Sequence, residues 1–412
     1  MISPGTYNEE ATVTVSSSLN FFSASGQADV VIIAPSSGEI FSINNAANVM
    51  FEWIELNGNQ SGSSCLAITS STVTLTGLMF HDCTSSSNGG AIIVGASSVV
   101  TVVNCTFAHN NAENTASSLG GAIYNDNSHI NLIGCNFTAN TAFSSSSIPY
   151  ATARSYGGAI YNTNGGTISM CGCILTTNTA PSNAGYSYAQ GGAICNSGGQ
   201  INLSDCTFTS NSAAGLYTKG GAIYNDGGVM TLSNCTFTNN SAASVWTYGG
   251  AIYNGAQMDV IGCTFTSNII SAGLAGGAMY SDGNLVVLGS FFSFNTVPGN
   301  GGAIFINSHS TLINCSITDN KANMGGGVYL AANTTCCGIT FDSNQAPDGP
   351  DYFLMEGVLF NNPPCPTTTT TTTTSTSTST STSTSTSTST STSTSTSTST
   401  STSTSTSTST ST

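Results

Sequence analysis

Positively charged side chains are almost absent from this sequence. The 412 residues contain 3 Lys plus Arg against 18 Asp plus Glu, which gives a formal net charge of −15. A polyanion such as nucleic acid would be repelled by this chain. We therefore expect no nucleic acid partner. With charged residues at only 5% of the chain, abundant Ser, Thr, Asn and Gly must hydrate the surface.

Long apolar segments are missing as well. No stretch has the length and apolarity of a membrane-spanning helix, and residues 1–20 lack the basic start and apolar run of a signal peptide. We therefore expect no membrane insertion by this chain. Its opening residues, 1–7, read as the interior of a domain, which indicates a truncated sequence or a mature fragment.

The chain is rich in one feature, an internal repeat that recurs about nine times. Each unit has the form Gly-Gly-Ala-Ile-Tyr-Asn, a turn, an alternating apolar segment, two turn residues and Cys-Thr-Phe-x-x-Asn. The Gly pair and the closing Asn are always 19 to 21 residues apart, whereas the stretch from that Asn to the next Gly pair varies from 5 to 17. A constant coil with one elastic loop is typical of a solenoid.

The period inside the unit is 2, as in Met230-Thr-Leu232 and Cys235-Thr-Phe237, which indicates strands with one side inward. Between these two strands every unit carries Asn, Asp or Gly, the residues that adopt the left-handed αL conformation at least cost. We expect a corner there. The predicted fold is all-β, a parallel β-helix of about twelve coils.

Stacked coils place equivalent residues above one another. The inward cysteines should pack as small buried thiols, and the closing asparagines should hydrogen-bond from coil to coil at a bend. The predicted structural ladders are Cys105, Cys135, Cys173, Cys206, Cys235, Cys263 and Cys315, and Asn110, Asn140, Asn178, Asn211, Asn240, Asn268, Asn295, Asn320 and Asn344. Four cysteines outside the column are the better disulfide candidates, namely Cys171, Cys195, Cys336 and Cys365.

The chain divides into four segments. Residues 1–88 are expected to form degenerate coils continuous with the repeat β-helix of residues 89–345. The Pro-rich and Phe-rich segment 346–366 is the expected C-terminal cap and linker. Residues 367–412 are entirely Thr and Ser, so we expect a disordered low-complexity tail. It could serve as an O-glycosylated stalk or be a repeat expansion of little function.

The paired Gly-Gly-Ala-Ile and Phe-x-x-Asn motifs resemble the repeats of the chlamydial polymorphic outer-membrane proteins, within the pectin-lyase-like right-handed β-helix superfamily. The resemblance covers roughly residues 1–345. It implies a right-handed β-helical passenger and, in the chlamydial proteins, an adhesin. It therefore suggests a secreted or cell-surface location.

One feature of the repeat is a candidate binding surface. The Ile of Gly-Gly-Ala-Ile-Tyr-Asn is expected to point inward, which turns the following Tyr outward. An exposed aromatic strip suits sugar rings or the apolar face of a protein. In the alternative, the elastic loops fold over the strip and bury it. The strip comprises Tyr124, Tyr161, Tyr224, Tyr253, Tyr280 and Tyr329, and is interrupted by Cys195 and Phe305.

Catalytic chemistry finds little support in the sequence. Pectin-lyase-like enzymes use clustered carboxylates and often a basic residue, whereas the basic residues here lie in elastic loops and the aspartates are scattered. We predict no catalytic residues, no cofactor and no metal site, because the four His do not recur with Cys or Asp at ligand spacing. The basic residues are Arg154, Lys219 and Lys321, and the scattered aspartates are Asp126, Asp226, Asp259 and Asp282.

The leading hypothesis is a non-catalytic adhesion or surface-structure protein whose partners are surface glycans or a protein of a host or neighbouring cell. The alternative is a polysaccharide lyase or hydrolase with a degenerate site. An ice-binding solenoid would need regular Thr-x-Thr rows, and Thr follows Cys in only some coils. In a eukaryotic host the chain could be a glycoprotein, with Asn-x-Ser/Thr sequons at Asn59, Asn104, Asn136, Asn202, Asn234, Asn239, Asn314 and Asn333.

Overall fold

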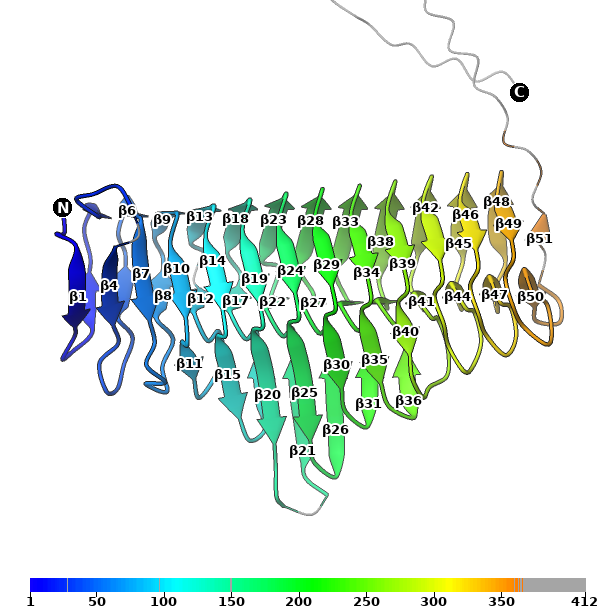
Figure 1. Ribbon diagram of the computed structural model, residues 1–412, viewed down its shortest axis with the longest axis horizontal. Helices are drawn as coiled ribbons and strands as arrows, with labels where there is room; N and C mark the ends of the chain where they lie inside the picture. Colours follow the sequence, from blue (N-terminus) through cyan, green and yellow to red (C-terminus); the bar gives the residue numbers. More distant parts are fainter. Residues whose placement is uncertain are drawn as a thin grey trace, which may run out of the picture. The chain divides into compact units, whose positions relative to one another are not determined.

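Each repeat unit forms one coil, and successive coils pair in parallel along a rod in the computed structural model (Figure 1). The structure describes residues 1–365 except 28, 96, 149, 359, 362 and 364. Within this part of the chain, three sheets of 13 strands run along the rod, so thirteen coils stand where about twelve were predicted. The expected tail, residues 367–412, lies outside the described residues.

The three long sheets are named here after their most regular side chains. The Tyr sheet consists of β2 (Val13–Val15), β5 (Phe41–Asn44), β8 (Leu66–Thr69), β12 (Ile92–Gly95), β17 (Ile123–Asp126), β22 (Ile160–Thr163), β27 (Ile194–Ser197), β32 (Ile223–Asp226), β37 (Ile252–Asn254), β41 (Met279–Ser281), β44 (Ile304–Ile306), β47 (Val328–Leu330) and β50 (Tyr352–Leu354). The aliphatic sheet consists of β3 (Leu19–Phe22), β6 (Val49–Glu52), β9 (Thr72–Thr76), β13 (Val99–Val103), β18 (His129–Ile133), β23 (Thr167–Cys171), β28 (Gln200–Ser204), β33 (Val229–Ser233), β38 (Gln257–Ile261), β42 (Leu285–Leu288), β45 (Ser310–Ile313), β48 (Thr334–Cys337) and β51 (Phe360–Asn361). The Phe sheet consists of β1 (Gly5–Asn8), β4 (Val30–Ile33), β7 (Ile54–Asn57), β10 (Met79–His81), β14 (Thr106–Ala108), β19 (Asn136–Thr138), β24 (Ile174–Thr176), β29 (Thr207–Thr209), β34 (Thr236–Thr238), β39 (Thr264–Thr266), β43 (Phe291–Ser293), β46 (Ser316–Thr318) and β49 (Thr340–Asp342).

The core consists of in-register columns, as the repeat predicts. Phe208, Phe237 and Phe265 are paired partners in adjacent strands, and their rings stack with centroids 4.6 and 4.8 Å apart. All three side chains are fully buried. Each coil therefore covers apolar surface that a single coil could not bury alone. The predicted cysteine column lies beside these rings and is buried and unbonded.

The closing asparagines form the predicted ladder. In a typical rung, Asn211 donates from its backbone N and its Nδ2 to Oδ1 of Asn240, at 3.0 Å each, and also donates from Nδ2 to the Leu175 carbonyl at 2.9 Å. Each rung thus satisfies the backbone N–H of its own asparagine and a backbone carbonyl of the preceding coil. At the C-terminal end, Asp351 replaces the next rung by accepting from Asn344 Nδ2.

Two left-handed corners flank the Phe-sheet strand of each repeat, and the sequence predicted one of them. The predicted corner is occupied by residues such as Asn234 (φ 53°) and Gly262 (φ 61°). The second corner directly precedes the ladder asparagine and is occupied by unfavourable residues such as Thr177 (φ 53°) and Phe294 (φ 56°). No glycine pattern marks this corner, because the asparagine hydrogen bonds hold it against a conformational cost of about 1–2 kcal/mol.

The elastic loops form an arm that projects from the middle of the rod (Figure 1). The arm has two sheets whose facing side chains are small and buried, such as Ala213 and Thr218, which lets the sheets approach closely. The first arm sheet consists of β11 (Thr84–Ser85), β15 (Asn111–Asn114), β20 (Thr141–Ser145), β25 (Thr179–Asn183), β30 (Ser212–Ala214), β35 (Ser241–Ala243) and β40 (Ile269–Ile270). The second arm sheet consists of β16 (Ser117–Leu119), β21 (Thr152–Tyr156), β26 (Tyr186–Gln190), β31 (Tyr217–Lys219) and β36 (Trp246–Tyr248).

The Gly pairs join the arm back to the rod. Gly220 has φ +68°, a left-handed conformation that side chains rarely adopt, and a Cβ on Gly221 would lie 2.1 Å from the carbonyl oxygen of Gly250 in the next coil. The pair therefore permits both the turn and the close contact between coils.

Two disulfides lie near the ends of the asparagine ladder. Cys65 bonds Cys83, which stands where a ladder asparagine would be, and Cys337 bonds Cys365. Of the four predicted candidates only Cys365 is bonded. The expectation was wrong for Cys171, Cys195 and Cys336, which are free. The segment expected to cap the helix supplies the last strands, β50 and β51, beside the second disulfide.

The asparagine ladder gives the first prediction. Asn240→Ala should lower the free energy of unfolding by on the order of 3 kcal/mol, because it leaves the Phe208 carbonyl and the Asn211 amide donors buried without partners. The measurement is urea unfolding of the disulfide-intact protein. The control is Asn202→Ala on an exposed strand position, which should change stability by less than about 0.5 kcal/mol. Equal losses in both variants would contradict the ladder.

The cysteines give the second prediction. Without reductant, a thiol reagent should modify one cysteine quickly in the native protein, the exposed Cys171, and ten after denaturation. Burial raises the pKa of the Cys105 and Cys336 thiols to about 12, which suppresses the reactive thiolate. Cys171→Ser should remove the fast reaction. Fewer than ten reactive thiols on denaturation would show that the column is oxidised.

Candidate functional site

The predicted tyrosine column exists, but it is not an exposed strip. Tyr161, Tyr224, Tyr253, Tyr280 and Tyr329 are only 5–8% exposed. Tyr124, at the N-terminal end of the column, is half-buried. The expectation of an exposed aromatic surface was therefore wrong, and the alternative of burial holds.

Two contacts bury the column. The rings stack on one another, for example Tyr224 on Tyr253 with centroids 5.2 Å apart and Tyr253 on Tyr280 at 5.5 Å. Side chains of the second arm sheet, including Tyr156 and Tyr248, pack against the column from the side. Sequence reasoning could not decide this, because the path of the elastic loops depends on arm sheets formed between coils.

Behind the tyrosines lies a second asparagine row that sequence reasoning missed. Asn125, Asn162, Asn196, Asn225 and Asn254 are fully buried, and each donates from Nδ2 to Oδ1 of the next, at 2.7 to 3.0 Å. The signal was present, because Asn follows Tyr in four of the six units that carry this Tyr. The row fixes the strand that presents the tyrosines.

The structure also brings together charged residues that are far apart in the sequence. Asp226 and Asp282 lie at equivalent positions two coils apart, on either side of the coil that carries Gly255. Lys219, at the end of β31, donates from Nζ to the Tyr253 hydroxyl at 2.9 Å, and Nζ lies 4.1 Å from the centroid of that ring. The second arm sheet therefore brings an elastic-loop cation to the Tyr sheet.

Hydroxyl groups connect this cluster. The Tyr253 hydroxyl donates to Oδ2 of Asp282 at 2.7 Å, and the Tyr280 hydroxyl donates to Oδ1 of the same carboxylate at 3.0 Å. The Tyr224 hydroxyl donates to Oδ2 of Asp226 at 2.6 Å. Lys219, Asp226, Asp282 and the three tyrosines together form what we call the Lys219 cluster.

Burial shapes the acid–base properties of this cluster. It raises the pKa of Tyr224 and Tyr253, and the hydrogen bonds to Asp226 and Asp282 raise it further, so both phenols stay neutral donors. Burial lowers the pKa of Lys219, against the opposing effect of the two carboxylates. Burial therefore disfavours the charged form of this lysine, whereas Asp282 and Asp226 favour it.

An aromatic row on the arm is more exposed than the column. Tyr188, Tyr217 and Trp246 are paired partners in β26, β31 and β36, and Arg154 occupies the same row in β21. The Tyr188 and Tyr217 rings stack with centroids 5.0 Å apart, and Trp246 is 47% exposed. This row lies on the same face of the arm sheet as Lys219.

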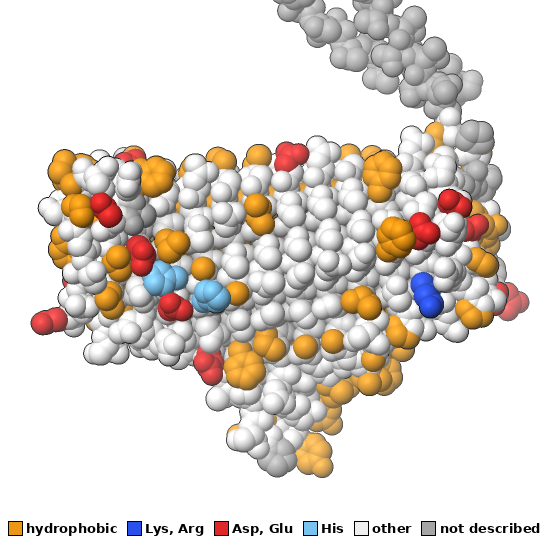
Figure 2. Space-filling view, in the orientation of Figure 1, with side chains coloured by type: hydrophobic (Ala, Val, Ile, Leu, Met, Phe, Trp, Pro, Cys, Tyr) orange, Lys and Arg blue, Asp and Glu red, His pale blue; other side chains and the backbone are white. Residues whose placement is uncertain are grey.

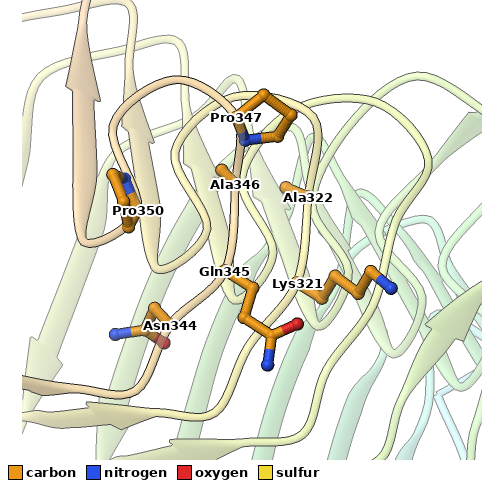
Figure 3. Close-up of a pocket in the computed structure, with 7 residues that line it drawn as sticks. All are labelled: Lys321, Ala322, Asn344, Gln345, Ala346, Pro347 and Pro350. Carbon is orange, nitrogen blue, oxygen red and sulfur yellow. The ribbon is translucent and has the colours of Figure 1, made fainter.

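The other candidate residues do not gather into a site. His81 bonds Glu55 and Asp82, at 2.8 Å each. Within the described residues no group of His, Cys, Asp or Glu could hold a metal ion, and no helix is long and apolar enough to cross a membrane. Lys321 borders a hollow of about 380 Å³ near the C-terminal coils (Figure 3), lined also by Ala322, Asn344, Gln345, Ala346, Pro347 and Pro350. A second hollow, of about 290 Å³, lies over the aliphatic sheet near Cys171.

Comparison with known families agrees with this architecture. Residues 220–396 match the family described as right handed beta helix region, and residues 205–226 match the Chlamydia polymorphic membrane protein (Chlamydia_PMP) repeat. Neither the curated proteins nor the solved structures gave a match. The chain therefore contains a right-handed β-helix region together with a repeat of the Chlamydia polymorphic membrane protein type.

Proposed function

We propose that this chain is a non-catalytic secreted or cell-surface protein that acts in adhesion or surface structure, with the arm as its contact surface. The observation that carries the proposal is that the arm exposes apolar side chains, on a rod that carries few charged ones. Hydrophobic side chains gather on the projecting arm in Figure 2. On the arm, Ile148, Tyr150 and Val245 are 68%, 81% and 64% exposed.

The arm has the properties of a binding surface on a rigid support. Apolar side chains exposed together are more often used for binding than isolated ones, and loops carried by a regular scaffold commonly hold the contact residues. The aromatic row of the arm adds Tyr and Trp, the residues enriched at interface hot spots. Since the tyrosine column is buried, the arm replaces it as the contact surface.

Other features support a location outside the cytoplasm. The two disulfides are typical of oxidising compartments. The matched repeat belongs to a family described as Chlamydia polymorphic membrane protein, which supports a surface location. The partner we propose is a surface glycan or a protein of a host or neighbouring cell, because both present apolar and hydrogen-bonding groups to Tyr and Trp. The eight sequon asparagines are exposed and accessible to N-glycosylation.

The third prediction tests the arm. Tyr186 in β26 and Trp246 in β36 are the exposed aromatics of the second arm sheet, at 44% and 47%. The double variant Tyr186→Ser, Trp246→Ser should bind target cells at least about tenfold more weakly, as expected for loss of an aromatic hot spot. Binding of labelled protein to cells is the measurement. Phe291→Ser removes an aromatic of the Phe sheet that is 55% exposed and should leave binding unchanged. Equal binding by all three proteins would reject the arm.

The Lys219 cluster favours a second candidate, a polysaccharide lyase or hydrolase. A lysine of lowered pKa beside two carboxylates has the elements of acid–base chemistry. The tyrosines that separate Lys219 from Asp282 are buried, however, and their raised pKa makes them weak proton donors. Fixed hydrogen bonds use both oxygens of Asp282. We therefore rank this candidate second.

The fourth prediction separates the two candidates. The unaltered chain should release no product from acidic or neutral polysaccharides, measured as reducing ends and as ultraviolet absorbance of unsaturated sugars. Turnover that disappears in Lys219→Met and Asp282→Asn but persists in Asp259→Asn would establish the enzyme. Asp259 is a suitable control because it lies on the aliphatic sheet, outside the cluster.

A further inference from the structure

The outward face of the Phe sheet carries two aligned rows of hydroxyl groups. Three consecutive strands, β29, β34 and β39, each present the pattern Thr-x-Thr, and their threonines are paired partners from coil to coil. The second row continues over seven coils without a break, through Thr138, Thr176, Thr209, Thr238, Thr266, Ser293 and Thr318. The first row contains Thr207, Thr236 and Thr264 and ends at Ile174 and Phe291.

The spacing of these rows is regular in two directions. Phe208, Phe237 and Phe265 lie between the two threonines of their strands, and their centroids repeat every 4.6 to 4.8 Å along the rod. Across the sheet, side chains two residues apart on a parallel strand are separated by about 6.6 Å. The hydroxyls therefore form a rectangular lattice.

The lattice is rigid. The Phe rings beneath it are fully buried and stack with interplanar angles of 4° and 8°. The backbone hydrogen bonds of the sheet continue on both sides, and the branched threonine side chain has few rotamers. Little conformational freedom would be lost when several of these hydroxyls contact an ordered surface together.

Charge is absent from the lattice. Between β14 and β46 the outward positions of the Phe sheet hold Thr, Ser, Asn, Ala, Ile and Phe, with no charged side chain. The middle of this face is largely white in Figure 2, and an acidic side chain lies at its upper edge. The threonines of β29, β34 and β39 are partly exposed, so their methyl and hydroxyl groups reach the surface.

We propose that the Phe sheet binds the surface of ice. Ice presents an uncharged, fixed lattice of oxygen atoms that can accept and donate hydrogen bonds, with repeats comparable to those of the two threonine rows. A rigid array of neutral hydroxyls and methyls matches such a surface at many points at once. A charged ligand finds no counter-charge here. This inference uses a different face from the arm and does not depend on the adhesion proposal.

The test uses the full chain made in a host without N-glycosylation, because glycans at Asn136 or Asn234 would cover the rows. Adsorption of labelled protein to growing ice crystals and the rate of ice recrystallisation are measured. The unaltered protein should adsorb and slow recrystallisation. Thr236→Lys, Thr238→Lys should abolish both effects, because two solvated ammonium groups interrupt the lattice.

Two controls complete the test. Thr231→Lys places a lysine on the aliphatic sheet and should keep the activity. Thr236→Val keeps the shape of the side chain but removes its hydroxyl, so a partial loss of ice adsorption is expected. This variant remains informative if the lysine variant unfolds the coil. Circular dichroism checks the fold of each variant. No adsorption by the unaltered protein, or equal loss in Thr231→Lys, would overturn the proposal.

Discussion

Parallel pairing of one coil on the next, with like residues above like, is the constraint on which the whole structure depends. A single coil exposes its Phe, its Cys and both faces of its backbone. Only a neighbour in the same register can cover the ring and accept the backbone hydrogen bonds. The asparagine ladder makes the register specific, because a shift by one residue would put a neighbouring side chain such as Ser212 or Ile269 in place of Asn and leave the bend without its donors. The disulfides lie near the ends of the ladder, where a coil loses one of its neighbours.

The same constraint explains the distribution of function over the molecule. Because the distance from the Gly pair to the closing Asn varies only from 19 to 21 residues, most of the variation in length falls in the segments after that Asn. These segments are long enough in the middle of the chain to pair with one another and form the arm. The arm therefore holds the exposed aromatics, including Trp246, and brings Lys219 to the Tyr sheet. A regular scaffold thus carries one irregular surface.

The fold followed from the sequence to a large extent, because each prediction rested on residues repeated many times. The Phe and Cys columns, the asparagine ladder and the first left-handed corner all lie where the repeat placed them. The candidate site followed much less well. The alignment of the tyrosine column was predicted correctly, but its exposure was not. Its burial depends on Tyr156 and Tyr248, which come from strands that do not repeat closely.

The sequence by itself determined the repeating elements, because alternation, turn residues and equivalent spacing are local properties that each coil satisfies in the same way. The tertiary structure alone decided what happens between coils and beyond them. Thr177 and Phe294 adopt left-handed corners because the hydrogen bonds of the neighbouring asparagines stabilise them, and Cys65 is bonded to Cys83. The tertiary structure also assembled Lys219 with Asp226 and Asp282 from separate coils. The physical reason is that burial and the interactions between charges depend on distances in space, and the lengths of the loops do not specify these distances.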